Sequence, residues 1–171
     1  MTRLVLTVIG QDRPGLVDRL SAAIAAADGS WQKSRMARLA GHFAGIVEVA
    51  VDADRAAALG EALKALPDLS IDVTVAKAEP TAARARVARL AFVGQDRPGL
   101  VQAISHVLAR AGANVDELET HSFPSPMSGV PIFEAEAEIH LPAEVSSAAL
   151  RAELEAVAKD LMVDMQFAEE A

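Results

Sequence analysis

The eight residues GQDRPGLV stand at positions 10–17 and return letter for letter at positions 94–101, a shift of 84 residues. The apolar positions that follow share the i, i+1, i+4, i+7, i+8, i+11 spacing of one helical face in both copies. They are Leu16, Val17, Leu20, Ala23, Ile24 and Ala27 in the first copy, and Leu100, Val101, Ile104, Val107, Leu108 and Ala111 in the second. Two copies are too few for a solenoid, so we expect two similar domains of roughly 80 residues each.

The first half of each copy predicts a strand, a helix and a hairpin. In the first copy, residues 3–9 are apolar and β-branched and predict a strand. Residues from about 14 to 27 then predict the helix. Residues 31–39 and 43–52 predict two strands, which the segment Ala-Gly-His between them joins in a hairpin turn.

The remainder of the copy predicts a second helix and a last strand. Alanine and leucine recur at helical spacing over residues 56–66, and Pro67 ends that helix. Apolar and polar residues alternate over 69–75, as in a half-buried strand. The order β-α-β-β-α-β is the ferredoxin-like, split βαβ arrangement. The predicted fold class is therefore α+β, with two antiparallel sheets that each carry helices on one face.

The predicted domains cover residues 1–78 and 87–171, and residues 79–86 form a short linker. In the second copy, strands near 114–123 and 132–141 flank a proline-rich loop that is longer than its counterpart. Because the linker is short, we expect the two sheets to join edge to edge, which would also cover exposed strand edges.

The composition limits the class of protein. Of the 171 residues, 51% are hydrophobic and 23% are charged, which favours packed globular domains over a disordered chain. The chain has no cysteine, which excludes disulfides, thiolate metal sites and a cysteine nucleophile. Its apolar stretches are far shorter than the roughly 20 residues of a membrane helix. The N-terminus has no signal-peptide core. We therefore expect a cytoplasmic protein that does not enter a membrane.

The charge is unevenly distributed along the chain. Residues 1–84 carry ten Lys and Arg and ten Asp and Glu, whereas residues 85–171 carry six and fourteen. An acidic second half disfavours direct binding to nucleic acid, which depends on phosphate neutralisation. With no tyrosine and one tryptophan, the chain also has few aromatic side chains on which bases could stack.

The repeated loop lies between a strand and a helix, where glycine-rich loops often bind phosphate. Leu16 and Val17 stand where such a loop needs lysine and a hydroxyl residue, and Pro14 lacks a backbone donor. Nucleotide hydrolysis is therefore not expected. Two interpretations stay open: residues 12–15 simply start a helix with Asp12 as the N-cap, or the first-turn N–H groups also bind a carboxylate. Capping does not require all eight residues twice, which favours a surface that both copies use.

These residues resemble those of a known family. Asp-Arg-Pro-Gly-Leu after a first strand, in a β-α-β-β-α-β domain of this size, is similar to the ACT domain, a small amino-acid-binding regulatory fold. Residues 112–115, Gly-Ala-Asn-Val, also resemble that family's pattern. Residues 125–133, Ser-Pro-Met-Ser-Gly-Val-Pro-Ile-Phe, are similar to a loop of the glycine cleavage system transcriptional repressor family.

The resemblance implies a ligand site between domains, formed by the loop after the first strand and the start of the second strand. In the second copy, the implied ligand-binding residues are Gly94, Gln95, Asp96, Arg97, Pro98, Gly99, Leu100 and Asn114. A weaker site has Gly10, Gln11, Asp12, Arg13, Pro14, Gly15, Leu16 and Ser30 at the matching positions. Ser30 replaces the asparagine and is the poorer two-way hydrogen-bonding partner.

Acidic side chains form a further constellation in the second copy. Glu134, Glu136, Glu138 and His140 share one face of a predicted strand, and Glu117, Glu119 and His121 share one face of the next strand. A solvated sheet face is the favoured interpretation over a metal site, because the histidines lack a tight ligand spacing. The same face also suits a basic partner.

No residue pattern points to catalysis, and we expect no catalytic residue, no metal and no cofactor. The favoured hypothesis is a regulator that binds a small amino acid, glycine or serine above others, and acts through a protein partner. The resemblance implies a transcription factor as that partner, and homodimers are an option. The alternatives are an ACT-type accessory domain that regulates an enzyme of amino-acid metabolism and, less favoured, a stand-alone enzyme. Trp31 is expected to pack in a core or an interface.

Overall fold

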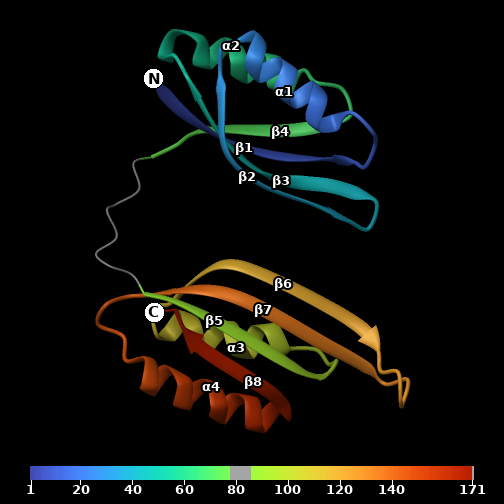
Figure 1. Cartoon of the computed structure of the whole chain (residues 1–171), viewed down its shortest axis with the longest axis vertical. Helices are drawn as coiled ribbons and strands as arrows, with labels where there is room; N and C mark the ends of the chain where they lie inside the picture. The colour runs from blue at the N-terminus through green and yellow to red at the C-terminus, as the bar shows by residue number, and fades with distance from the viewer. Residues whose placement is uncertain (78–85, 171) are drawn as a thin grey trace. The chain divides into compact units, whose positions relative to one another are not determined.

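The structure is a computed structural model that describes residues 1–77 and 86–170. The chain divides into two compact units, Met1–Glu79 (unit 1) and Pro80–Ala171 (unit 2). Unit 1 contains β1 (Thr2–Gln11), α1 (Leu16–Ala26), β2 (Ser30–Leu39), β3 (His42–Val51), α2 (Ala53–Lys64) and β4 (Leu69–Val75). Unit 2 contains β5 (Arg86–Gln95), α3 (Leu100–Arg110), β6 (Asn114–Pro124), β7 (Pro131–Leu141), α4 (Ser147–Leu161) and β8 (Val163–Glu169) (Figure 1).

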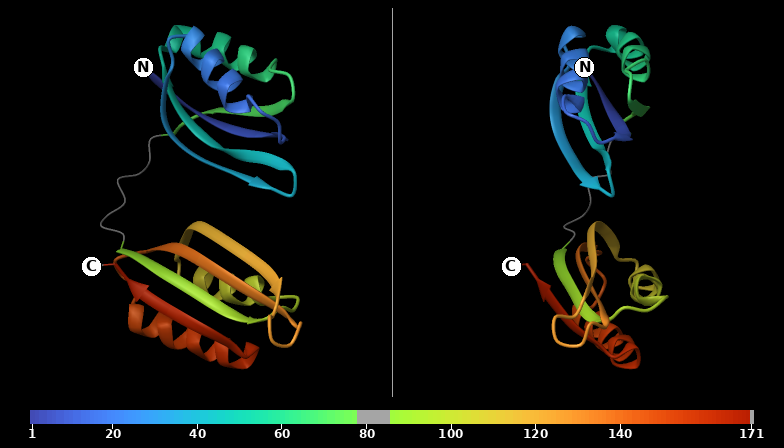
Figure 2. Two further views of the ribbon diagram at one scale, coloured as in Figure 1. Left: turned by 45° about the vertical axis from the view of Figure 1, so that its right-hand side comes forward. Right: turned by 90° about the vertical axis from the view of Figure 1, so that its right-hand side faces the viewer.

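Each unit is one four-stranded antiparallel sheet with two helices on one face. The strand order is β2-β3-β1-β4 in unit 1 and β6-β7-β5-β8 in unit 2. Within each unit, both helices cover one face of the sheet, and the opposite face has no helix (Figure 2). The predicted α+β fold with two β-α-β-β-α-β copies is therefore confirmed.

The hairpin of unit 1 forms where the sequence predicts it. Ala40 and Gly41 have φ values of 48° and 78°, and such paired positive φ values are typical of the tight turns that match strand twist. The longer loop of unit 2 joins β6 to β7 at Pro124 and Pro131. Both units also have an irregularity at the start of the hairpin, between Trp31 and Lys33 and between 115 and 117, as a duplicated fold should.

Two expectations about the connection between the units stay predictions. The predicted linker, residues 79–86, lies outside the described residues except for Arg86, the first residue of β5. The expectation that the sheets join edge to edge stays a prediction as well. Among the described residues, no helix has the length and apolar character needed to cross a membrane.

Each unit has its own hydrophobic core between its sheet and its helices. In unit 1 the core is formed by alternate residues of the strands and one face of each helix, including Leu6, Val47, Leu20 and Leu63. Unit 2 has the equivalent core, which includes the completely buried Leu154. No charged or polar residue of the described part of the chain is buried. Each fold is therefore held mainly by apolar packing.

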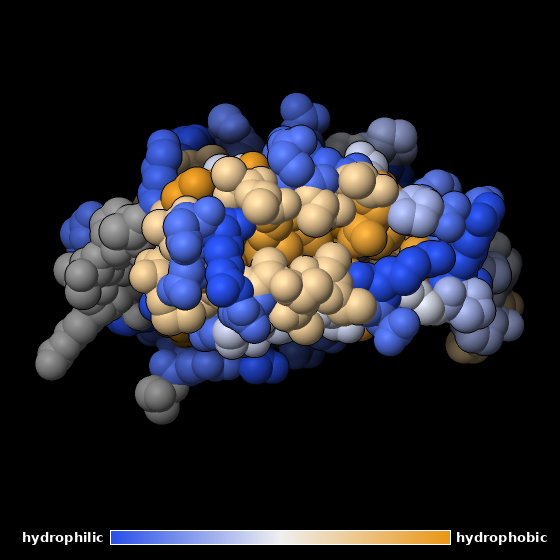
Figure 3. All heavy atoms as spheres, turned by 90° about the horizontal axis from the view of Figure 1, so that it is seen from above, coloured by the Kyte–Doolittle hydropathy of each residue, from blue (hydrophilic) through white to orange (hydrophobic). Residues whose placement is uncertain are grey.

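Val17 and Val101 belong to the apolar stripe of their helices, yet they are 47% and 38% exposed. A residue that directly follows a buried position lies about 100° around the helix, which turns it to the rim of the packed face. Many exposed positions of α1 and α2 are alanines. Hydrophobic residues therefore lie between hydrophilic ones on the helix-covered surface of unit 1 (Figure 3).

Leu63→Ala should destabilise unit 1, because Leu63 is completely buried and the truncation leaves a cavity. The expected loss is about 2–5 kcal/mol in the free energy of unfolding. Trp31 packs against the unit 1 core and is the chain's single tryptophan, so its fluorescence in a urea titration reports on this unit. Leu39→Ala is the matched control, since Leu39 is 80% exposed in the same unit and its loss should cost little. Equal losses from the two variants would contradict this description of the core.

Candidate functional site

The repeated octet forms an exposed corner between a strand and a helix in each unit. We call residues 10–16 the first corner and residues 94–100 the second corner. After β1, the backbone N–H of Asp12 donates to the carbonyl of Gly41 at 2.9 Å, and in unit 2 Asp96 donates to Pro131 at 2.8 Å. These bonds extend the ladder with the neighbouring strand by one residue before the chain turns toward the helix.

A glycine makes the turn in both corners. Gly15 and Gly99 are the N-cap residues of α1 and α3, with φ values of 87° and 94°. Residues with a side chain rarely adopt this left-handed backbone conformation, which explains the glycine at both positions. A Cβ atom at either glycine would meet no heavy atom within 4 Å, so the space beside the backbone is open.

The predicted Asp12 cap is wrong, and the helix starts two residues later than predicted. No side chain caps α1 or α3. Asp12 instead pairs with Arg38 on β2, with 2.5 Å between Oδ2 and Nε. The equivalent Asp96 accepts a hydrogen bond from Ser122 Oγ at 2.7 Å. These partners come from another strand, so the local sequence did not reveal them.

The absence of a cap leaves donors available at both helix starts. The first backbone bonds within the helices run from Arg19 N to Gly15 O (3.1 Å) and from Ala103 N to Gly99 O (2.9 Å). The N–H groups of the preceding first-turn residues have no partner within a helix. They lie at the positive end of the helix dipole, where an anion is stabilised.

The other predicted residues of the corners have different roles. Gly10 and Gly94 are packing positions: a Cβ there would overlap the carbonyl oxygen of Asp68 and the side chain of Val163, respectively. Leu16 and Leu100 point into the cores and are 3% exposed, so any contact with a ligand would have to come from their backbone. The glutamines and prolines of both corners are exposed.

Asn114 and Ser30 do not join the corners of their own units. Gly94 pairs with Phe133 on β7, whereas Asn114 pairs with His140 on the same strand. Seven residues of extended strand separate these two positions, about 23 Å. Ser30 has the same relation to the first corner. In addition, Asn114 Nδ2 donates to Asp116 Oδ1 at 2.7 Å. Asn114 therefore takes no part in the second corner of its own unit.

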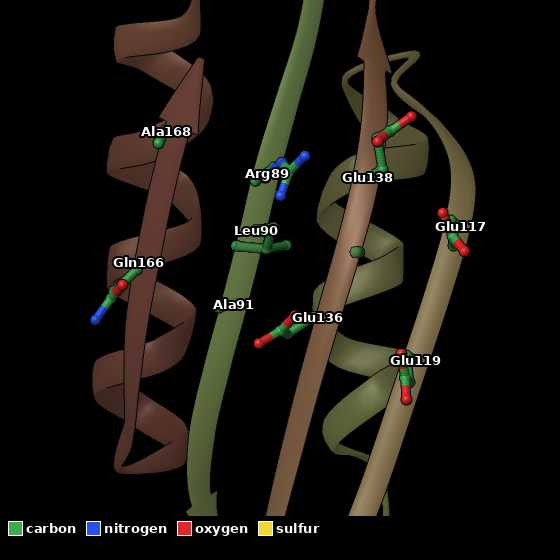
Figure 4. A pocket seen from close by; sticks show the side chains of 10 residues that line it. Arg89, Leu90, Ala91, Glu117, Glu119, Glu136, Glu138, Gln166 and Ala168 are labelled. Atoms are coloured by element: carbon green, nitrogen blue, oxygen red, sulfur yellow. The ribbon is translucent and has the colours of Figure 1, made fainter. Parts of the chain in front are cut away.

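The two predicted acidic rows face each other across the β6–β7 pair on the open side of the unit 2 sheet. Their register places Glu117 opposite Glu138, Glu119 opposite Glu136 and His121 opposite Glu134. The glutamates of these rows other than Glu134 line a shallow pocket together with Arg89 from β5 and Gln166 from β8 (Figure 4). Like charges directly opposite each other, such as Glu119 and Glu136, destabilise a sheet.

Arg89 is a cation at this acidic face. Its Nε donates to Glu170 at 2.7 Å. This hydrogen bond and the negative charges of Glu170, Glu138 and Glu136 raise the pKa of Arg89 above its ordinary value. Within residues 1–77 and 86–170, no group of three or more His, Asp or Glu side chains is arranged to hold a metal ion.

The structure adds residues to the corners that sequence reasoning missed. In the first corner, Arg13 Nη1 pairs with Asp68 Oδ1 at 3.1 Å, and Arg19 Nη2 lies 3.6 Å from Asp68 Oδ2. In the second corner, Ser122 and Met162 take the places of Arg38 and Asp68. The 84-residue offset identifies the first of these replacements. Identifying the second requires the register of the last strand.

Comparison with known proteins places this geometry in a family. The family model for the ACT domain matches residues 2–76 and again residues 90–168. Among solved structures, an unknown protein from Galdieria sulphuraria is 32% identical, with a TM-score of 0.89 over 99% of each chain. A proposed glycine cleavage system transcriptional repressor is 17% identical, with a TM-score of 0.75 over 99% of this chain and 97% of that one.

No match is found among curated proteins. The two matches to the family model coincide with the two sheets and their corners, and together they span most of the sequence. The chain therefore belongs to the ACT-domain family and carries two copies of the domain in tandem.

Proposed function

We propose that this ACT-domain regulatory protein is not a catalyst and binds a small amino acid at the second corner, with glycine or serine favoured. The observation that carries the proposal is the uncapped start of α3 beside Gly99, where free N–H groups meet open space. A carboxylate there would accept hydrogen bonds from the first helical turn. Val101 is partly exposed in the same turn and offers an apolar contact for the body of a small ligand.

The size of the ligand limits its affinity. Glycine has about five non-hydrogen atoms, and the best small ligands gain about −1.5 kcal/mol per atom. The binding free energy is therefore about −7.5 kcal/mol at most, weaker than a micromolar complex. Such an affinity suits a sensor of an abundant metabolite, and titrations should reach millimolar ligand.

Asn114 lies too far from the second corner of its own unit to contact a ligand there. Because it lies at the far end of its own sheet, we propose that Asn114 completes the second corner of another copy of the chain. The ligand would then hold two chains together, and a homodimer would be the ligand-bound form. A ligand that favours one assembly over another can regulate a protein in this way.

We further propose that the protein acts through a protein partner, with a transcription factor as the first candidate. The likeness to a proposed glycine cleavage system transcriptional repressor supports this choice at the level of the fold. The acidic face around Glu119 and Glu136 suits a basic protein surface and disfavours nucleic acid. The alternative partner is an enzyme of amino-acid metabolism, and identification of the proteins that co-purify with the chain distinguishes the two.

Gly99→Val should weaken or abolish amino-acid binding, because the branched side chain fills the open space beside the first turn of α3. Isothermal titration with glycine and with serine should show one ligand per wild-type chain and a loss of about tenfold or more in affinity for the variant. Gly129→Val is the matched control in the same unit: Gly129 also has a positive φ (70°) and open surroundings, but it lies in the hairpin loop. Unchanged binding by Gly99→Val, or no binding of any amino acid by the wild type, would refute the proposal.

Asn114→Ala should lower the affinity for the ligand and prevent ligand-induced dimers. Sedimentation of the wild-type chain should change from monomer toward dimer as the amino acid is added. Ser30→Ala, at the equivalent position of unit 1, should behave as the wild type. A monomer that binds the amino acid with full affinity would show that Asn114 takes no part.

A further inference from the structure

The two corners have the same seven residues but different electrostatic surroundings. In the first corner, the guanidinium of Arg13 donates to Asp68 and also, through Nη2, to Gln11 Oε1 at 3.0 Å. Asp68 also pairs with Arg19. The carboxylate of Asp68 thus pairs both with Arg13 of the first corner and with Arg19 of α1.

The second corner has no such carboxylate. β8 begins beside Gly94 as β4 begins beside Gly10, and Met162 precedes Val163 as Asp68 precedes Leu69. Asp68 and Met162 even share the left-handed conformation, with φ values of 65° and 53°. The 84-residue offset also replaces Arg19 by Ala103.

Arg97, the counterpart of Arg13, consequently lacks an acidic partner. Three arginines of the described chain have a buried Nε with no hydrogen-bond acceptor: Arg19, Arg86 and Arg97. Arg19 and Arg86 form ion pairs through their other nitrogens, with Asp68 and Glu169. Within residues 1–77 and 86–170, Arg97 has no ion pair and no hydrogen bond through its guanidinium. A partly buried cation without an acceptor is costly, and an added anion relieves that cost.

We propose that Arg97 binds the carboxylate of the ligand. In the first corner, the carboxylate of Asp68 already pairs with Arg13, the counterpart of Arg97, and thereby prevents an anion from binding there. A guanidinium matches a carboxylate with two parallel hydrogen bonds, which gives both strength and orientation. This inference rests on the proposed amino-acid site and specifies its chemistry: the ligand must carry a carboxylate. It also makes the second corner the binding corner, even though both corners have an arginine.

Met162→Asp tests the inference by giving the second corner the carboxylate of the first. The fold should be retained, because aspartate tolerates the left-handed conformation and Asp68 already adopts it at the equivalent position. Titration of the full chain with glycine or serine should show an affinity about tenfold or more below that of the wild type. Met162→Asn is the matched control, with nearly the same shape and no charge, and should bind as the wild type.

The outcomes separate this inference from the proposed function. If the wild type binds no amino acid, the proposed function itself fails. If the wild type binds and Met162→Asp binds equally well, or Met162→Asn loses as much, the role of Arg97 is refuted. Acetate, which has the same carboxylate, should compete with the amino acid. Binding of inorganic phosphate in place of amino acids would count against a carboxylate ligand.

Asp68→Asn is the reciprocal test, because it should free Arg13 in the first corner. Asparagine also accepts the left-handed conformation, so the turn before β4 should be preserved. The number of ligands bound per chain should then rise from one toward two. A stoichiometry that stays at one would contradict the claim that Asp68 closes the first corner.

Discussion

A glycine held at positive φ is the constraint on which both corners depend. Gly15 and Gly99 turn the chain from strand to helix in a conformation that other residues avoid, and no side chain reaches back to cap the helix that follows. The backbone N–H groups of the first turn are therefore left to solvent or to a ligand. The open space beside each glycine and the uncapped start of the helix both follow from this path of the chain.

The duplicated fold has diverged around its most similar residues. The octet is unchanged, but its surroundings contain Arg38 and Asp68 in unit 1 and Ser122 and Met162 in unit 2. Unit 1 thus neutralises its corner from within, whereas unit 2 leaves an arginine without a counter-ion and gathers carboxylates on the open face of its sheet. The two copies therefore share a scaffold but differ in the charges around their corners.

The sequence was sufficient to predict the fold because local signals agreed with one another. Alternation over residues 69–75, the turn around Gly41 and the helical spacing after each octet all specify the same order of elements. The corners were harder to predict. Asp12 has the sequence context of an N-cap but pairs with Arg38 on β2, which the fold places on the far side of β3. Asn114 lies close to the second corner in sequence, yet the return of α3 along the sheet carries it to the opposite end.

Chemical-shift mapping of the isotopically labelled wild-type chain tests the central claim most directly, because it observes each corner separately. On addition of serine or glycine, the account predicts that the backbone amides from Asp96 to Gln102 shift together and saturate, while those from Asp12 to Asp18 stay in place. Equal shifts in both corners, or shifts confined to other parts of the chain, would contradict it.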